Sequence, residues 1–165
     1  MRIFISGQCR AGKTTLANQL ANYIDCPTYA YADRLKELAV QYNPSLAPEI
    51  YAETKTPATR QLLGSIAMQY KAKFGNNVFT NLVHNKCLNT DSSIVSDLRF
   101  RDELALVKRD FPNAVILYVG TDISEYDCRD IFMEMDILLP PRPIKNELQL
   151  ANLVQRIKLL YGHQI

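Results

Sequence analysis

The sequence predicts an α/β fold of three layers, in which a mostly parallel sheet of about five strands has helices on both faces. Two observations predict it. Short apolar segments alternate along the chain with longer segments of helical periodicity, as in parallel sheets covered by helices. The chain has 165 residues, of which 47% are hydrophobic. This is enough to form one hydrophobic core, but the chain is short for two separate cores. We therefore expect a single domain over residues 1–165.

The N-terminal part predicts two strands, each followed by a helix. In the first helix Leu16, Leu20 and Ile24 recur at helical spacing. Asp33 stands where an N-cap would precede the second helix. The elements expected here are a strand over residues 2–6, a helix over 13–24, a strand over 29–32 and a helix over 34–42.

The remaining chain predicts a loop followed by further strands and helices. Residues 43–57 contain Pro44, Pro48 and Pro57 and show little periodicity, which favours a mobile segment that covers a substrate. A polar segment over residues 120–134 is expected to form a short lid. The other expected elements are helices over 58–73, 76–88, 102–110 and 147–161, and strands over 93–98, 114–119 and 136–139.

Charge and composition exclude several classes of protein. Lysine and arginine number 19 against 17 acidic residues, a net charge of +2, which is too small to favour nucleic acid or an anionic membrane as a partner. No apolar run is long enough to cross a bilayer or to act as a signal peptide, so we expect a cytoplasmic protein. The four cysteines are far apart in the sequence, and we expect reduced thiols rather than disulfides or a zinc site.

A glycine-rich motif lies between the first expected strand and the helix after it. Residues 7–15 match the pattern G-x-x-x-x-G-K-[ST]. Gly7 and Gly12 allow backbone N–H groups to close around phosphate oxygens, which the helix N-terminus also attracts. Lys13 would bridge the β- and γ-phosphates of ATP, and the Thr14 hydroxyl would bind Mg²⁺. The motif predicts nucleoside triphosphate binding on a P-loop NTPase fold, which motors, GTPases, sulfotransferases and small-molecule kinases share.

Charged residues follow the third and second expected strands. Asp97 ends the third strand, where ligands of open α/β sheets gather, and it is a candidate ligand of Mg²⁺ or of a substrate. Arg99 would emerge on the same face. The alternative is an ordinary strand end with a solvated helix start.

Asp33, Arg34 and Lys36 follow the second strand and would border the same cleft. Arg34 and Lys36 are two residues apart on a helix and cannot point the same way, so one of them is expected at the surface. Arg60 begins a helix, and its guanidinium suits a phosphate; a plain solvated charge is the alternative.

Five motifs in one order resemble the deoxynucleoside monophosphate kinases of bacteriophages. The resemblance runs from Met1 to about Val119. The motifs are G-x-x-R-x-G-K-x-T, A-D-x-L-K, T-R-x-L-L-x-x-x-A, F-G-x-x-V-F and S-D-x-R-F-x-x-E.

The resemblance implies a P-loop kinase fold that transfers the γ-phosphoryl group of ATP, with Mg²⁺, to a deoxynucleoside 5′-monophosphate. The donor loop would comprise Gly7, Arg10, Gly12, Lys13, Thr14 and Thr15. On the acceptor side, Asp33, Arg34 and Lys36 would border the nucleotide, Arg60 would hold its phosphate, Asp97 and Arg99 would face it, and residues 74–79, with Phe74 and Asn77, would shape the base and sugar pocket. Asp97 would share Mg²⁺ with Thr14.

The sequence departs from this family at three places. Thr14 replaces the aspartate that often follows the loop lysine. After the fourth strand the family tends to have an arginine and then a longer lid. Here the segment is short and its single arginine is Arg129, which is the candidate for closing a lid over the triphosphate. A proline-rich turn over residues 140–143 replaces the polar turn expected near the adenine.

The same sequence features also suit other functions. A P-loop kinase for another phosphorylated molecule, such as dephospho-coenzyme A or phosphomevalonate, and a non-catalytic ATP-binding regulator are the alternatives. The helices over residues 58–88 could pair in a homodimer or simply cover the sheet.

Overall fold

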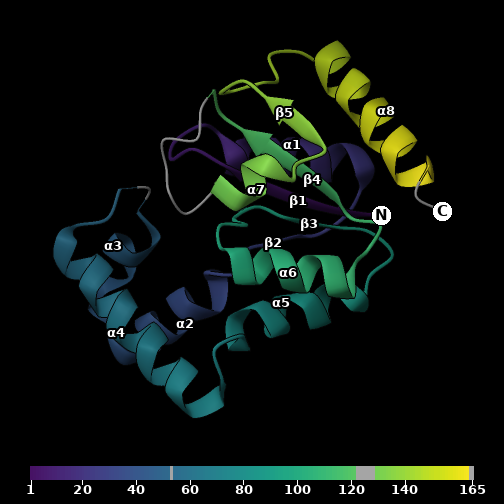
Figure 1. The fold of residues 1–165 in the computed structure, drawn as a ribbon. Helices are drawn as coiled ribbons and strands as arrows, with labels where there is room; N and C mark the ends of the chain where they lie inside the picture. The colour runs from purple at the N-terminus through teal and green to yellow at the C-terminus, as the bar shows by residue number, and fades with distance from the viewer. Residues whose placement is uncertain (53, 122–128, 164–165) are drawn as a thin grey trace. The chain divides into compact units, whose positions relative to one another are not determined.

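A single parallel sheet organises the chain (Figure 1). The computed structural model describes residues 1–52, 54–121 and 129–163, apart from the side chains of residues 129, 130 and 163. The sheet has five strands in the order β2-β3-β1-β4-β5, and all the pairings in it are parallel. The strands are β1 (Arg2–Gly7), β2 (Thr28–Tyr29), β3 (Ser93–Val95), β4 (Val115–Val119) and β5 (Ile137–Leu139). The predicted α/β fold is confirmed.

Helices connect the strands, and the chain divides into two compact units. Unit 1 comprises residues 1–30 and 84–165, and unit 2 comprises residues 31–83. No helix among the described residues is both long enough and apolar enough to span a membrane. The helices are α1 (Lys13–Ile24), α2 (Asp33–Tyr42), the 3₁₀ helix η1 (Pro44–Leu46), α3 (Ala47–Tyr51), α4 (Pro57–Phe74), α5 (Val78–Leu88), α6 (Arg101–Asp110), α7 (Arg129–Met133) and α8 (Glu147–His163).

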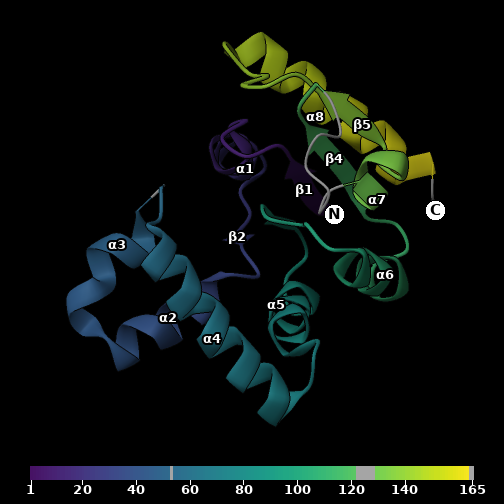
Figure 2. The same ribbon diagram turned by 60° about the vertical axis from the view of Figure 1, so that its left-hand side comes forward.

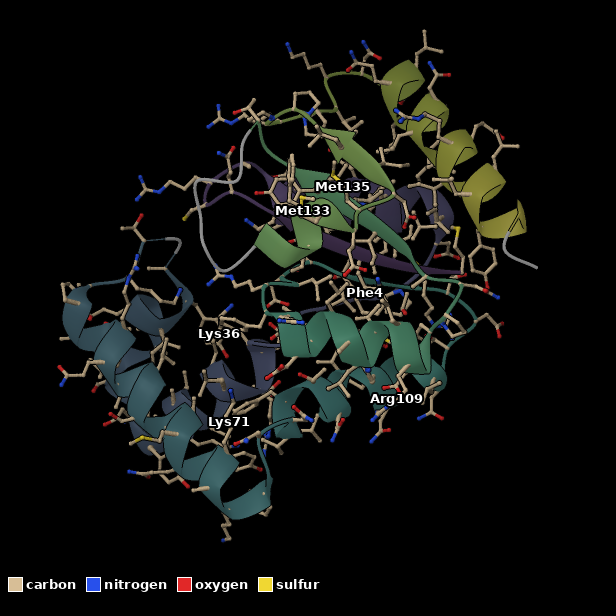
Figure 3. All side chains as sticks on the ribbon, viewed as in Figure 1. Phe4, Lys36, Lys71, Arg109, Met133 and Met135 are labelled. Atoms are coloured by element: carbon tan, nitrogen blue, oxygen red, sulfur yellow. The ribbon has the colours of Figure 1, made fainter. Side chains whose placement is uncertain are left out.

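The core of unit 1 lies on both faces of the sheet, because successive side chains of a strand point to opposite faces. Ile3 and Ile5 of β1 belong to a cluster with Leu16 of α1 and Val154 of α8. Phe4, which lies between them and is labelled in Figure 3, faces the other way. Its ring centroid is 5.6 Å from that of Phe111, which follows α6. Both ribbon views place the sheet between α8 and α6 (Figures 1 and 2).

Unit 2 contains helices and no strand within its described residues. It holds α2, η1, α3, α4 and the start of α5, which continues into unit 1. Helix α2 contacts both α3 and α4, and Figure 2 shows the three helices gathered together. A single kinase domain over all 165 residues stays a prediction.

The prediction of a loop over residues 43–57 is wrong, because η1 and α3 occupy most of it. Pro44, Pro48 and Pro57 each stand in the first turn of a helix. In that position a proline loses no intrahelical hydrogen bond, and its fixed φ suits the helix. Mobility of this segment stays a prediction.

Further boundaries differ from the prediction. The expected strand over residues 93–98 is shorter in the structure, where β3 ends at Val95, so Asp97 follows the strand and is not part of it. The expected strand over residues 29–32 is shorter and earlier in the structure, where β2 covers only Thr28 and Tyr29. Asp33 is the first residue of α2 rather than its N-cap, which is Ala32. A carboxylate in a first turn is still favourable there, because it faces the positive end of the helix dipole.

Candidate active site

The glycine-rich loop leaves β1 in close contact with the end of β4. Gly7 has a φ of 133°, and a Cβ at this position would overlap the carbonyl oxygen of Val119. The Gln8 N–H donates to that same carbonyl oxygen at 3.0 Å. Glycine is therefore required at position 7 by backbone conformation and by space.

The loop turns back on itself before α1 begins. Arg10 and Gly12 both have left-handed backbones, with φ of 59° and 94°. The Leu16 N–H donates to the Gly12 carbonyl at 2.9 Å and so opens α1. Backbone N–H groups around left-handed residues form concave anion sites, so this loop has the conformation that the phosphate-binding motif predicts.

Lys13 holds its ammonium group over the loop. Its Nζ donates to the carbonyl oxygens of Gly7 at 2.8 Å and Gln8 at 2.6 Å. Thr14 and Thr15 follow in the first turn of α1 and are exposed. No acidic residue stands in that turn, so nothing there opposes the attraction of the helix N-terminus for an anion.

Asp97 and Arg99 lie in unit 1 beside the glycine-rich loop's strand. The Leu98 N–H donates to the Ile5 carbonyl at 3.1 Å, which holds the segment after β3 against β1. Asp97 is half-buried and Arg99 is exposed. The carboxylate of Glu103 accepts the Arg99 N–H at 2.8 Å, so the backbone here is fixed while the guanidinium is in solvent.

Three predicted acceptor residues occupy the first turn of α2 in unit 2. Asp33, Arg34 and Lys36 are each half-buried, and Figure 3 shows Lys36 on this helix. Arg34 Nη1 lies 3.1 Å from Glu37 Oε2. That hydrogen bond, with a weaker one to Tyr70, raises the pKa of Arg34. Arg34 is therefore already engaged within its own unit.

Arg60 stands in the first turn of α4, whose start is organised by hydroxyl groups. Thr56 caps the helix, because its Oγ1 accepts the Thr59 N–H at 3.1 Å. The buried Thr59 hydroxyl donates to Glu49 Oε2 of α3 at 3.0 Å. Arg60 itself is exposed, so a guanidinium and the N-terminus of a long helix occur together here.

An aromatic cluster marks the other end of α4. The ring of Tyr70 lies 4.5 Å from that of Phe74 and 5.5 Å from that of Phe79, between centroids. Phe74 is 52% exposed, and Lys73 Nζ lies 5.2 Å from its ring centroid. Asn77 is exposed between α4 and α5. Phe74 is thus available to a ligand, with Tyr70 packed behind it.

The predicted residues therefore divide between the units. Unit 1 brings together the donor loop, Asp97 and Arg99 near the carboxyl ends of β1 and β3. Unit 2 carries the remaining acceptor candidates, namely Asp33, Arg34, Lys36, Arg60, Phe74 and Asn77. Arg129 begins α7, but its side chain lies outside the described residues, as does most of the expected lid.

The residues after β1 and β3 suit Mg²⁺. The described residues contain no group of three or more histidine, cysteine, aspartate or glutamate side chains that could hold a metal ion. Mg²⁺ does not need one, since it binds through one or two protein oxygens, substrate phosphates and water. The Thr14 hydroxyl and the Asp97 carboxylate are such oxygens, and both belong to unit 1.

Sequence reasoning missed three residues that support these positions. Gln8 Oε1 accepts the Thr121 N–H at 3.1 Å, the Arg142 N–H donates to the Ala11 carbonyl at 2.8 Å, and Tyr70 supports Phe74 and Arg34. The proline-rich turn around Arg142 was the one visible signal.

Cys9, Cys26 and Cys87 are free thiols, of which only Cys87 is buried, and Cys128 lies outside the described residues.

Comparisons of the sequence with known proteins give a likeness over part of the chain. No protein-family model matches the chain. A cytidylate kinase from Pyrobaculum calidifontis is 38% identical over 77 residues, which make up 46% of this chain and 41% of that kinase. The chain thus matches less than half the length of this curated relative.

Solved structures match almost the whole chain at low sequence identity. A protein from Chloroflexus aurantiacus with a provisional kinase assignment has a TM-score of 0.54 at 14% identity, over 99% of this chain and 97% of its own. A dephospho-CoA kinase from Campylobacter jejuni has a TM-score of 0.50 at 14% identity, over 99% and 98%. A shikimate kinase from Bacteroides thetaiotaomicron gives 0.50 at 14%, over 98% of each chain. Together with the parallel sheet and its glycine-rich loop, these likenesses establish that the chain has the P-loop kinase fold.

Proposed function

We propose that this protein is an ATP-dependent kinase that phosphorylates a deoxynucleoside 5′-monophosphate, giving the diphosphate and ADP. The observation that carries the proposal is the glycine-rich loop over residues 7–15, called the phosphate loop below. In this loop Lys13 Nζ donates hydrogen bonds to the carbonyl oxygens of Gly7 and Gln8. An ammonium forms stronger, charge-assisted hydrogen bonds with phosphate oxygens than with neutral carbonyl oxygens. The loop is thus suited to receive a triphosphate.

The donor residues would act by neutralising and orienting the triphosphate. Lys13, Arg10 and, on the resemblance, Arg129 would balance its charge. Thr14 and Asp97 would hold Mg²⁺, which supplies further charge at the phosphates. Such charge stabilisation and alignment account for most of the catalysis in phosphoryl transfer.

The acceptor would be a nucleotide, as the resemblance to the phage kinases implies. Arg60 would hold the 5′-phosphate at the start of α4. Phe74 would contact the base, with Asn77 near it, while Asp33 and Lys36 would border the nucleotide and Arg99 would face it. The likeness to a cytidylate kinase over part of the chain supports an acceptor of this class.

No general base is needed for this reaction. An oxygen of the acceptor phosphate, already ionised at neutral pH, would attack the γ-phosphorus of ATP. The new P–O bond forms as the bond from the γ-phosphorus to the bridging oxygen of ADP breaks. Neither histidine is then required for catalysis, consistent with the packing of His84 in the core of unit 1.

The resemblance to phage enzymes extends the proposal to the protein's setting. We propose deoxynucleotide metabolism in the cytoplasm of a phage host, with small-molecule nucleotides and no nucleic acid as partners. A homodimer through α4 and α5 belongs to the same proposal. Sedimentation equilibrium over a range of protein concentrations would test it, and a monomer at all concentrations would contradict it.

A coupled assay of ATP consumption tests the proposed activity. The acceptors are the four deoxynucleoside monophosphates, AMP, GMP and dephospho-coenzyme A, with Lys13→Ala as the control for a contaminating kinase. We expect turnover with one or more deoxynucleotides and none in the variant.

Turnover confined to dephospho-coenzyme A would contradict the proposed nucleotide acceptor and would indicate a kinase for another phosphorylated molecule. ATP binding without turnover on any acceptor would instead indicate a regulatory module.

A further inference from the structure

The turn between β5 and α8 touches the phosphate loop through one backbone group. The Arg142 N–H donates to the Ala11 carbonyl oxygen at 2.8 Å. A Cβ added at Gly12 would lie 3.5 Å from Arg142 Cγ and 3.6 Å from its Cα, so the turn also packs against the loop. All these residues belong to unit 1.

Arg142 makes this contact from an unusual conformation. Its φ is 51°, a left-handed value that residues other than glycine and asparagine rarely adopt. Pro141 and Pro143 flank it, and their fixed φ values restrict the turn on both sides. Strained conformations of this kind persist only where the surrounding structure holds them, and they are frequent at functional sites.

The hydrogen bond fixes the peptide plane between Ala11 and Gly12. In a planar trans peptide the C=O and N–H groups point in opposite directions. Because the Ala11 carbonyl points at Arg142, the Gly12 N–H points away from it. That N–H is one of the backbone donors that the loop can offer to a phosphate.

We propose that Arg142 is a positioning residue for the phosphate donor, and that it acts through its backbone. Its left-handed N–H holds the Ala11–Gly12 peptide in the orientation that binds the triphosphate, and its guanidinium is not required. This inference rests on the proposed function, since it names what sets the affinity of the same loop for ATP.

Two substitutions separate the backbone of Arg142 from its side chain. Arg142→Gly and Arg142→Val both remove the guanidinium. Glycine adopts the left-handed conformation freely, whereas a β-branched valine does not. We expect Arg142→Gly to keep the KM for ATP within about twofold of wild type and Arg142→Val to raise it about tenfold. The KM for the acceptor should change in neither variant.

Amide hydrogen exchange without nucleotide tests the contact directly. The amide of residue 142 should be protected in the wild type and in Arg142→Gly, and should exchange rapidly in Arg142→Val. The amide of Gly120, which donates to the Leu139 carbonyl at 2.8 Å, is the internal control. Its continued protection in Arg142→Val would show that the sheet is intact and that the change is local.

Equal losses of ATP affinity in the two variants would overturn the proposal in favour of a guanidinium contact. It would also be overturned by unchanged affinity in both variants, or by an unprotected Arg142 amide in the wild type. A wild-type protein that binds no ATP would instead contradict the proposed function, and the exchange measurement would still decide whether the turn holds the loop.

Discussion

The two units hold their candidate residues in different ways. In unit 1 the phosphate loop is fixed by its backbone, through the contacts of Gln8 with Val119 and of Ala11 with Arg142. In unit 2 the long helix α4 buries only Thr59, and its candidate residues depend on side-chain hydrogen bonds and ring contacts. Sites fixed by buried backbone are held more rigidly than sites on solvated elements. The comparison therefore predicts a preformed donor site and an adaptable acceptor site.

The largest effect should come from removing the cation of the donor loop. Lys13→Ala is expected to lower kcat by about 10²–10³-fold, because a fixed charge that stabilises the transition state is lost. Steady-state kinetics would measure it, with Lys158→Ala, an exposed lysine of α8 in the same unit, as the matched control. Similar losses in the two variants would contradict the assignment of Lys13.

The phosphate loop could be predicted from the sequence because few conformations satisfy its spacing. Gly7 and Gly12 have positive φ, and the spacing to Lys13 placed α1 at residues 13–24, as the structure has it. Apolar runs likewise identified the buried strands β1 and β4. These features depend on local geometry and burial, which a sequence pattern records directly.

The rest depends on contacts between residues far apart in the sequence. Pro44 and Pro48 indicated a loop, but whether a proline ends or starts a helix is decided by the packing around it. The hydrogen bond of Arg142 to Ala11 joins residues more than a hundred positions apart. Tyr70 of α4 similarly gains its role from Arg34, which lies on α2.

A second prediction distinguishes binding of the acceptor nucleotide from binding of ATP. Arg60→Ala should raise the KM for the acceptor about 10–100-fold, the range expected for a charge-assisted hydrogen bond, while the KM for ATP stays unchanged. Arg60→Lys should give an intermediate value, because an ammonium cannot bind a phosphate bidentately. Arg156→Ala, on the exposed side of α8 in unit 1, is the control. An equal rise in both KM values would place Arg60 outside an acceptor site.

A smaller effect should distinguish the stability of the units. Thr56→Ala removes the cap of α4 and should cost about 1 kcal/mol, whereas Thr56→Ser keeps an accepting hydroxyl and should cost little. Hydrogen exchange should accelerate in the first turns of α4 but not in β1 or β4. Acceleration in all three elements would show that the units open together and would remove the contrast between them.

The smallest effect is a dependence of stability on pH that originates in unit 1. His84 is 2% exposed, lies edge-on to the rings of Phe4 and Phe111, and has Nδ1 2.7 Å from Asp110 Oδ2. A carboxylate only accepts, so Nδ1 carries the proton of a neutral imidazole. Burial lowers the pKa of His84, and the hydrogen bond to Asp110 only partly opposes this.

A lowered histidine pKa makes the folded protein bind fewer protons than the unfolded chain just below the ordinary value of about 6.5. The free energy of unfolding should therefore fall as the pH falls through this window, down to the lowered pKa. Asp110 adds no slope there, because its hydrogen bonds with Arg109 hold its pKa below the usual carboxyl range. Urea unfolding at about pH 7.5 and 5.5 should show the slope in wild type and in His163→Gln, and its loss in His84→Gln. A slope that survives in His84→Gln would mean that carboxylates, and not the buried imidazole of unit 1, set the acid sensitivity.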